Sequence, residues 1–482
     1  MLIVNWKPNK NSSIPIYKQI VDYIKEKIST GEWDIGSKLP TQRELAKILE
    51  VNRSTVVEAL DELKAEGLIE GKRGGGTMIV NNTWSLLVST PPPNWQSYIE
   101  SGIHKPNLPT IQIINKLESE KGIIRLGTGE LASGLYPHDM MKMVLNSVSQ
   151  KVTSLGYEEP KGLMFLRETI SEYLKKYGIN VLPSKKLIVS GSIQALQLIS
   201  IGILQRGSTV LIEKPSYLSS LNLFQSSGIK LKGIPMDNHG IKADELIKSI
   251  NYKNPNLLYT IPTFQNPTGN VMSEERRNEI LKICTKHRLP IIEDDAYREL
   301  WLDEEPLKPL KAKDKNGDVV YLGSVSKTIA AGLRIGWLVG PENVIEHLSD
   351  IKMQIDYGTS SLSQWVLAEW ISSGLYDKYL LELRNALRTR RQLALNVLEK
   401  YFVDIATWNK PKGGFYIWIK LKKHISMSKL FELSYKKGIL INPGNIYDSS
   451  NNENIRISYS YASLTDLEKG LEILSKLIRE CY

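Results

Sequence analysis

The chain has 482 residues, more than one ordinary hydrophobic core accommodates, so at least two domains are expected. Hydrophobic residues make up 41% and charged residues 24%, a globular composition that excludes an intrinsically disordered chain. The net charge of +10 permits an acidic partner, and two cysteines are too few for a disulfide framework or a cysteine metal site. There is neither an apolar run of membrane-spanning length nor a secretory signal, so we expect a cytoplasmic protein with no membrane or metal partner.

Residues 1–80 carry the patterns of three short helices and a β-hairpin. Apolar side chains recur on one face of "PIYKQIVDYIKEKISTG", and Thr41 with Glu44 forms the capping box of a second helix in "LPTQRELAKILEV". The third helix, "NRSTVVEALDELKAEG", ends at Gly67, and "LIEGKRGGGTMIV" has the pattern of two strands around a glycine-rich tip. This order predicts a winged helix-turn-helix domain.

In a winged helix-turn-helix, the first turn of the third helix enters the major groove of double-stranded DNA. An arginine in that turn suits a guanine edge, and hydroxyl side chains reach phosphates or bases. The alternative is a small protein-binding domain, and the near balance of twelve basic against eleven acidic side chains in residues 1–80 leaves it open. The predicted DNA contacts are Arg43, Arg53, Ser54, Thr55, Lys72 and Arg73.

The stretch from "LPTQRELAKILEV" through "GKRGGGTMIV" resembles the DNA-binding domain of the GntR family of bacterial regulators. The resemblance implies DNA contacts at Arg43, Arg53, Ser54 and Thr55, and it places the tip of the wing at Gly74 and Gly75. Many members have a further arginine where this chain has Val57, so base readout at that position is expected to differ.

Residues 81–120 are rich in proline and lack periodicity, which predicts a linker and N-terminal arm. Trp84, Trp95 and Tyr98 indicate that part of it docks on a neighbouring surface. From 121 to about 370, apolar strands alternate with amphipathic helices, which predicts an α/β domain with an open, mostly parallel sheet covered on both faces. Residues 371–482 predict a smaller α+β lobe.

Lys327 lies in "GSVSKTIAAGLRIGW", at the end of an apolar run. The simplest interpretation is a strand that ends in a polar surface turn. The Ser-x-x-Lys pattern also occurs in serine β-lactamases, but the Ser-Asp-Asn and Lys-Thr-Gly motifs that they require are missing from this sequence. A third interpretation is a lysine that binds pyridoxal 5′-phosphate (PLP) as a Schiff base.

A PLP site has separate chemical requirements, and the sequence offers residues for each of them. The protonated pyridine nitrogen needs a carboxylate, which Asp294 supplies at the end of an apolar strand. Tyr297 and Asn266 could reach the ring hydroxyl, and Tyr217 could lie on the ring face. The phosphate requires hydroxyls, an arginine and the N–H groups of a helix N-terminus. The candidates for phosphate binding are Ser192, Ile193, Ser324, Ser326 and Arg334.

Each of these features alone has a simpler explanation as a turn or a core residue. Their joint occurrence, in this order and at predicted strand ends, favours the PLP site, because open α/β sheets bind ligands at the carboxyl ends of their strands.

From about residue 121 onward the chain resembles the fold-type I aminotransferases, through "GYEEPKGLMFLRETISEYL", "VSGSIQALQLI", "EKPSY", "PTFQNPTG", "IIEDDAYRELW", "YLGSVSKTIAAGLRIGW", "PKGGFYIWI" and "NIRISYS". The resemblance implies that Lys327, Asp294 and Tyr217 are catalytic and that Arg456 and Asn266 bind the substrate, with Arg456 on its α-carboxylate. It also implies a homodimer. The cofactor contacts that it implies are Lys327, Asp294, Tyr297, Asn266, Tyr217, Ser192, Ile193, Ser324, Ser326 and Arg334, with Tyr157 reaching the partner subunit's phosphate. Relatives often have glutamine where this chain has Ile193, which leaves only a backbone contact there.

A GntR-like domain joined to an aminotransferase-like domain resembles the MocR/GabR regulators. Three functions remain open. The first is a transcription regulator that binds PLP at Lys327 and senses an amino acid or amine through Schiff-base exchange. The second is an active aminotransferase with an accessory DNA-binding domain. The third, a protein-interaction module on an inert scaffold, is disfavoured by the intact set of PLP residues.

Overall fold

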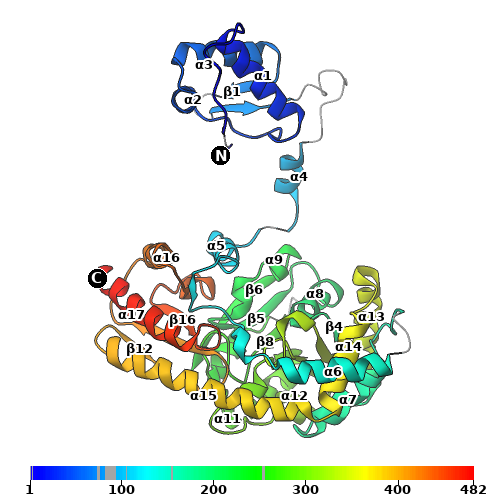
Figure 1. The fold of residues 1–482 in the computed structure, drawn as a ribbon. Helices are drawn as coiled ribbons and strands as arrows, with labels where there is room; N and C mark the ends of the chain where they lie inside the picture. Colours follow the sequence, from blue (N-terminus) through cyan, green and yellow to red (C-terminus); the bar gives the residue numbers. More distant parts are fainter. Residues whose placement is uncertain are drawn as a thin grey trace. The chain divides into compact units, whose positions relative to one another are not determined.

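The computed structural model describes residues 2, 4–72, 76–81, 94–104, 106–152, 156–251 and 256–482, and gives no side-chain burial for Lys72. Trp84 and the predicted wing-tip residues Arg73, Gly74 and Gly75 therefore lie outside the described residues. The chain divides into two compact units, Met1–Gly102 and Ile103–Tyr482 (Figure 1).

The first unit is a winged helix-turn-helix, as predicted. Its elements in chain order are α1 (Ile16–Ser29), α2 (Gln42–Leu49), α3 (Arg53–Ala65), β1 (Ile69–Lys72) and β2 (Gly76–Ile79). The strands β1 and β2 pair antiparallel. The apolar stripes of the three helices meet in one buried cluster that includes Ile20, Ile24, Leu45, Val56 and Leu60.

The predicted capping box at the start of α2 is present. The backbone N–H of Thr41 donates to Glu44 Oε2 at 2.8 Å, and the backbone N–H of Glu44 donates to the Thr41 hydroxyl at 3.3 Å. These two bonds satisfy N–H groups that the first turn of a helix otherwise leaves without partners. The cap therefore sets the start of the helix that precedes α3.

The region predicted as a linker contains two helices with different surroundings. In α4 (Trp95–Ser101), Trp95 and Tyr98 are 69% and 65% exposed, and their rings pack against each other. In α5 (Pro109–Leu117), Ile114 is buried in the core of the second unit. The second unit thus begins within the predicted linker, because α5 has an apolar face that this core covers.

An eight-stranded, mostly parallel sheet forms the centre of the second unit, in the order β4-β11-β10-β9-β8-β5-β6-β7. Strands β10, β9, β8, β5 and β6 are mutually parallel, and β11 runs antiparallel to both of its neighbours. The bounds are β4 (Lys186–Val189), β5 (Thr209–Lys214), β6 (Lys230–Asp237), β7 (Gly240–Ile241), β8 (Asn256–Thr260), β9 (Ile291–Asp294), β10 (Val319–Ser324) and β11 (Gly336–Val339).

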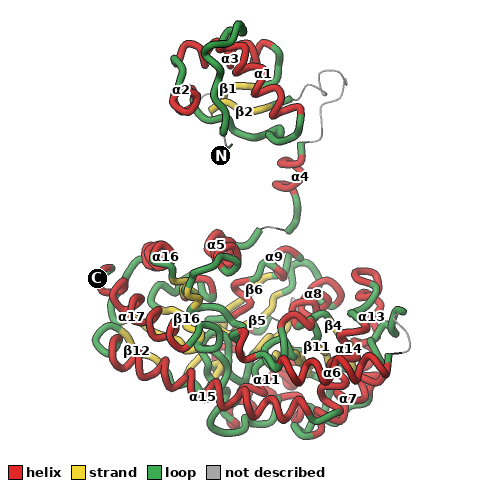
Figure 2. Tube along the Cα trace, viewed as in Figure 1, coloured by secondary structure: helices red, strands yellow, loops and turns green. Residues whose placement is uncertain are grey.

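Helices cover both faces of this sheet (Figure 2). Successive side chains of a strand point to opposite faces, so Leu187 and Val189 pack with α8 and α13, whereas Ile188 packs with α7 and α14. The helices of this part are α6 (His138–Lys151), α7 (Met164–Lys175), α8 (Ser192–Gly202), α9 (Leu223–Ser226), α10 (Ala243–Ser249), α11 (Glu274–His287), α12 (Leu310–Lys313), α13 (Glu342–Asp356) and α14 (Ser361–Ser372).

The C-terminal lobe has a four-stranded sheet of order β12-β13-β16-β15. Its elements are α15 (Leu375–Tyr401), β12 (Ala406–Trp408), β13 (Tyr416–Leu421), α16 (Met427–Lys436), β14 (Ile439–Leu440), β15 (Asn442–Pro443), β16 (Asn454–Ser458) and α17 (Leu464–Glu480). The strand β3 (Ile124–Arg125), which the sequence had assigned to the large domain, pairs with β14 of this lobe. A two-residue strand leaves no periodic pattern from which that pairing could be predicted.

None of the helices in the described ranges is long and apolar enough to cross a membrane. Within the same residues, no group of three or more histidine, cysteine, aspartate or glutamate side chains is placed to hold a metal ion.

Candidate functional site

A cavity of about 350 Å³ opens in the second unit, where β5, β8, β9 and β10 reach their carboxyl ends. It lies where ligands bind in open α/β sheets. Every predicted cofactor or substrate residue except Tyr157 lines it: Ser192, Ile193, Tyr217, Asn266, Asp294, Tyr297, Ser324, Ser326, Lys327, Arg334 and Arg456. Tyr157 is 82% exposed and packs against the ring of Tyr357 instead.

Lys327 follows the last residue of β10 by three positions and points into the cavity wall formed by residues 128–130. Its Nζ donates to the carbonyl oxygen of Gly129 at 2.7 Å. A Cβ at Gly129 would lie 2.2 Å from the hydroxyl oxygen of Tyr416, so only glycine fits between the lysine and that ring. The lysine lines the cavity, and within the described part of the chain its amine donates to one neutral acceptor.

Asp294 is the last residue of β9, and its carboxylate is buried at the bottom of the cavity. Its Oδ2 accepts from the Tyr259 hydroxyl at 2.8 Å, and its Oδ1 accepts from the backbone N–H of Ala296 at 3.2 Å. Burial raises the pKa of this carboxyl from 3.8 to about 6. A cationic ring nitrogen bound beside it would stabilise the carboxylate and offset the cost of its burial.

This pKa predicts a pH dependence of stability in the cofactor-free protein. Because the folded chain retains the Asp294 proton up to about pH 6 and the unfolded chain releases it near 3.8, the free energy of unfolding falls as the pH rises between these values. Between pH 4.5 and 7 the wild type should lose about 2 kcal/mol more than the Asp294→Asn variant. Urea unfolding at the two pH values measures this difference, and equal losses in both proteins would contradict it.

The N-terminus of α8 forms the opposite end of the cavity. Its N-cap, Gly191, has no side chain to satisfy the first N–H groups of the helix, which Ser192 and Ile193 present to the cavity. Gly191 has φ +88°, and a Cβ there would lie 2.6 Å from Nη2 of Arg334, which donates to Ser190 O at 2.9 Å. The hydroxyls of Ser324 and Ser326 lie 3.1 Å apart on the same wall.

This arrangement fits the phosphate of PLP. Free N–H groups at a helix N-terminus, two hydroxyls and a guanidinium are the donors that a phosphate dianion requires. Side chains for the ring line the same cavity. Asn266 Nδ2 donates to the Tyr297 hydroxyl at 3.3 Å, and the backbone N–H of Tyr217 donates to Asn266 O at 3.1 Å. The cavity therefore offers PLP a separate partner for each of its polar groups.

Arg456 on β16 projects from the C-terminal lobe and is 5% exposed. Its Nη1 donates to Asn266 Oδ1 at 2.8 Å and its Nη2 donates to Gly127 O at 2.7 Å. Its Nε is buried and has no hydrogen-bond partner within the described residues. A buried cation with an unused donor is suited to a carboxylate ligand.

Sequence reasoning missed Tyr416, although its stretch "PKGGFYIWI" was recognised. The Tyr416 hydroxyl lies 3.1 Å from that of Tyr297, and its ring centroid lies 4.0 Å from the guanidinium carbon of Arg456. This cation–π contact orients the arginine toward the cavity. The only available signal was the position of Tyr416 near the start of a predicted strand, which does not indicate the direction of a side chain.

Sequence reasoning also missed Glu213 on β5. A glutamate after an apolar run usually marks the exposed end of a strand, so the sequence did not indicate that this carboxylate is buried. Its carboxylate accepts from Thr260 Oγ1 at 2.5 Å and from Gln265 Nε2 at 3.0 Å. Gln265 immediately precedes Asn266, so Glu213 positions the turn that carries Asn266. Burial raises the pKa of Glu213 to about 7.

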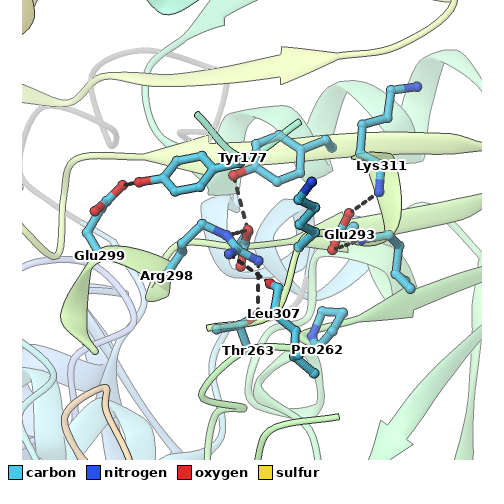
Figure 3. A network of polar contacts seen from close by, with 12 residues as sticks. Tyr177, Pro262, Thr263, Glu293, Arg298, Glu299, Leu307 and Lys311 are labelled. Carbon is cyan, nitrogen blue, oxygen red and sulfur yellow. Dashed lines mark hydrogen bonds and ion pairs between the residues drawn. The ribbon is translucent and has the colours of Figure 1, made fainter. Parts of the chain in front are cut away.

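Figure 3 shows a second buried network, around the residues that flank Asp294. Glu293 accepts from the backbone N–H groups of Leu310 and Lys311, each at 2.8 Å. The Arg298 guanidinium pairs with Asp295 and donates to Leu307 O at 3.0 Å. Glu293 and Asp295, the residues on either side of Asp294, are both held by these contacts. The backbone at Asp294 is therefore fixed in place.

Four of the predicted DNA contacts, those on α2 and α3, are described, and each is exposed or half-buried. Arg53 and Ser54 in the first turn of α3 are exposed, and Thr55 is half-buried. Arg53 Nη2 donates to Gln42 Oε1 at 3.1 Å, which links the start of α3 to the start of α2. Arg43 is exposed on α2. Among the predicted wing residues, Lys72 ends β1, whereas Arg73, Gly74 and Gly75 are outside the described part of the chain.

Two family models match the chain. Residues 16–79 match the bacterial regulatory proteins of the gntR family, and residues 121–474 match the class I and II aminotransferases. The HTH-type transcriptional regulator YisV of Bacillus subtilis is 52% identical over 479 residues, which is 99% of each chain. The HTH-type transcriptional regulator NorG of Staphylococcus aureus is 37% identical over 90% of this chain and 98% of that protein.

A solved structure is similar to most of this chain. The kynurenine aminotransferase of Pyrococcus horikoshii, crystallised in complex with PMP, has a TM-score of 0.74 and 32% identity over 78% of this chain and 96% of that chain. The chain therefore belongs to the HTH-type transcriptional regulators of the MocR/GabR type, in which a gntR-family DNA-binding domain is joined to a PLP-binding domain of the class I and II aminotransferases.

Proposed function

We propose that this regulator senses an amino acid or amine in the cofactor cavity and that the bound ligand changes how two DNA-binding domains are presented to an operator. The observation that carries the proposal is the meeting of Lys327, Asp294 and Arg456 in one cavity. Bound PLP supplies an aldehyde carbon that takes up an amine nitrogen and a ring that withdraws electrons from that nitrogen.

The residues of the chain act around that chemistry. Lys327 provides the amine that a ligand amine replaces, and Gly129 O can hold the released lysine Nζ. Asp294 would accept a hydrogen bond from the ring nitrogen of PLP and favour its protonated form. Arg456 binds the carboxylate of the ligand through its unused donor. The phosphate donors around α8 hold the cofactor while the lysine is displaced.

We further propose that the protein acts as a cytoplasmic homodimer. Tyr157 is exposed outside the cavity of its own subunit, and Tyr357 and Leu362 are 59% and 49% exposed. Exposed aromatic and aliphatic side chains of this kind are typical of a surface that a second subunit covers. Tyr157 would then contact the phosphate in the partner subunit. Sedimentation of Tyr157→Ala and wild-type protein, with and without PLP, tests this arrangement.

Transamination is a second candidate, and the complete set of Lys327, Asp294 and Arg456 favours it. In this function the first unit would regulate or localise an enzyme. The two candidates differ in what becomes of the ligand, because an enzyme converts the amino acid to a 2-oxo acid and a sensor returns it unchanged.

Single-turnover mixing separates these functions. The PLP-loaded protein is mixed with a panel of amino acids and amines and no keto-acid acceptor, while the visible spectrum and the formation of keto acid are followed. We expect a spectral shift without keto acid, and the ligand that causes it should change the affinity for DNA from upstream of the protein's own gene. Rapid, complete conversion to keto acid would identify an aminotransferase.

A further inference from the structure

Residues 106–118, here called the arm, form one wall of the cofactor cavity. Asn107, Ile111, Ile114, Asn115 and Glu118 all line it. The arm is attached at both ends, since Asn222 Nδ2 donates to Pro106 O at 2.9 Å and Thr128 Oγ1 donates to Glu118 Oε1 at 2.7 Å. A ligand in this cavity therefore contacts the segment that begins the second unit.

The cavity has more charged side chains than PLP would bind. The charged side chains that line it are Glu118, Glu130, Asp294, Lys327, Arg334 and Arg456. Bound PLP would be held by Asp294, Lys327 and Arg334, which suit its ring nitrogen, aldehyde carbon and phosphate. Arg456, Glu118 and Glu130 remain, and neither glutamate forms an ion pair within the described ranges.

The ligand side of the cavity thus has one cation and two carboxylates. Arg456 is buried with an unused Nε donor, which suits a carboxylate. The glutamates favour a cation elsewhere on the same ligand. Ile111, Ile114, Leu221 and Ile446 line the cavity as well, and their apolar surfaces suit a short methylene chain between these charged groups.

We propose that the ligand is a basic amino acid, with a carboxylate at Arg456, one amine at Lys327 and a second, cationic group bound by Glu118 at the end of α5. This inference rests on the proposed function, because it assigns the ligand class of the same cavity. It excludes acidic ligands, whose second carboxylate would face Glu118 and Glu130.

Because Glu118 lies at the end of the arm, ligand binding at Glu118 would also change the stability of the arm. A ligand held by both Arg456 and Glu118 links β16 of the C-terminal lobe to α5. This bridge stabilises the arm only when the ligand carries the cationic group. Such a ligand therefore binds the protein more tightly when the arm is packed on the cavity than when the arm is detached from it. That difference in affinity is what a ligand requires to shift a conformational equilibrium.

The experiment is a titration of the cofactor spectrum of the full-length, PLP-loaded protein with L-lysine, L-norleucine and L-glutamate. Lysine and norleucine share an unbranched six-carbon chain and differ in the terminal ammonium group of lysine. We expect lysine to bind about tenfold to a hundredfold more tightly than norleucine, as for a hydrogen-bonded charge pair, and glutamate to bind most weakly. In Glu118→Gln, the affinity for lysine should fall to that for norleucine, which should be unchanged.

Glu120→Gln is the matched control, because Glu120 is exposed two residues further along and does not line the cavity. It should retain the preference for lysine. The Glu118→Lys variant should bind L-2-aminoadipate more tightly than lysine, a gain that misfolding cannot produce. Equal affinities for lysine and norleucine in the wild type would overturn this inference and leave the proposed function standing, whereas no spectral response to any amino acid or amine would overturn both.

Amide hydrogen exchange measures the stability of the arm independently of the cofactor spectrum. Saturating lysine should slow amide exchange in residues 109–117 of the wild type and of Glu120→Gln, and should leave it unchanged in Glu118→Gln. Protection by norleucine equal to that by lysine would overturn the role of Glu118.

Discussion

Replacing Lys327 with alanine should abolish the visible absorbance that the lysine-bound cofactor gives, while the protein remains folded. Lys327 is the one lysine that lines the cavity, and its Nζ contacts only the carbonyl of Gly129 among the described residues. Its removal therefore costs little packing but removes the nucleophile that holds the aldehyde carbon. We expect a complete loss of the covalent link, the largest effect of any substitution considered.

Two measurements check this expectation. The first is the spectrum of the variant after PLP is added and excess is removed, with Lys248→Ala as control because that lysine is exposed on α10. The second is borohydride reduction followed by peptide mass analysis, which should place the cofactor on the Lys327 peptide of the wild type. A cofactor attached at another lysine, or an unchanged spectrum of Lys327→Ala, would show that the assignment is wrong.

Replacing Arg53 with alanine should produce the largest loss of DNA affinity. Arg53 is exposed in the first turn of α3, and its guanidinium is oriented by Gln42. A guanidinium bound to a guanine edge contributes about 1–3 kcal/mol, so each DNA-binding domain should lose at least about fivefold in affinity. In the proposed homodimer, the losses of the two domains on one operator would multiply. Binding to unrelated DNA should change much less, because phosphate contacts dominate it.

Titrations of the upstream DNA at several salt concentrations measure this loss. Lys18→Ala is the control, since Lys18 is exposed on α1 rather than in the first turn of α3. An Arg53→Ala protein that binds the upstream DNA as tightly as the wild type would remove Arg53 from the interface. An equal loss on specific and unrelated DNA would show that Arg53 contacts phosphate rather than bases.

Local patterns in the sequence determined many of the helices and strands of this protein. The capping box at Thr41 and the apolar stripe of α1 are confirmed, because such features depend on residues within one or two turns. Apolar strands alternating with helices, predicted from residue 121 to about 370, are also present, among them the strands that end at Asp294 and Ser324. Parallel strands bring their carboxyl ends to one edge, so the sequence could indicate that residues far apart in the chain would meet there.

The tertiary structure alone decided what closes the cavity. Tyr416, which sequence reasoning missed, comes from the C-terminal lobe, and the arm comes from a region whose prolines indicated a linker. The pairing of β3 with β14 joins segments more than 300 residues apart, and no periodic pattern encodes such a contact. Glu213 and Glu118 acquire their roles from neighbours that only folding supplies, because the environment of a carboxylate depends on burial and on the donors around it.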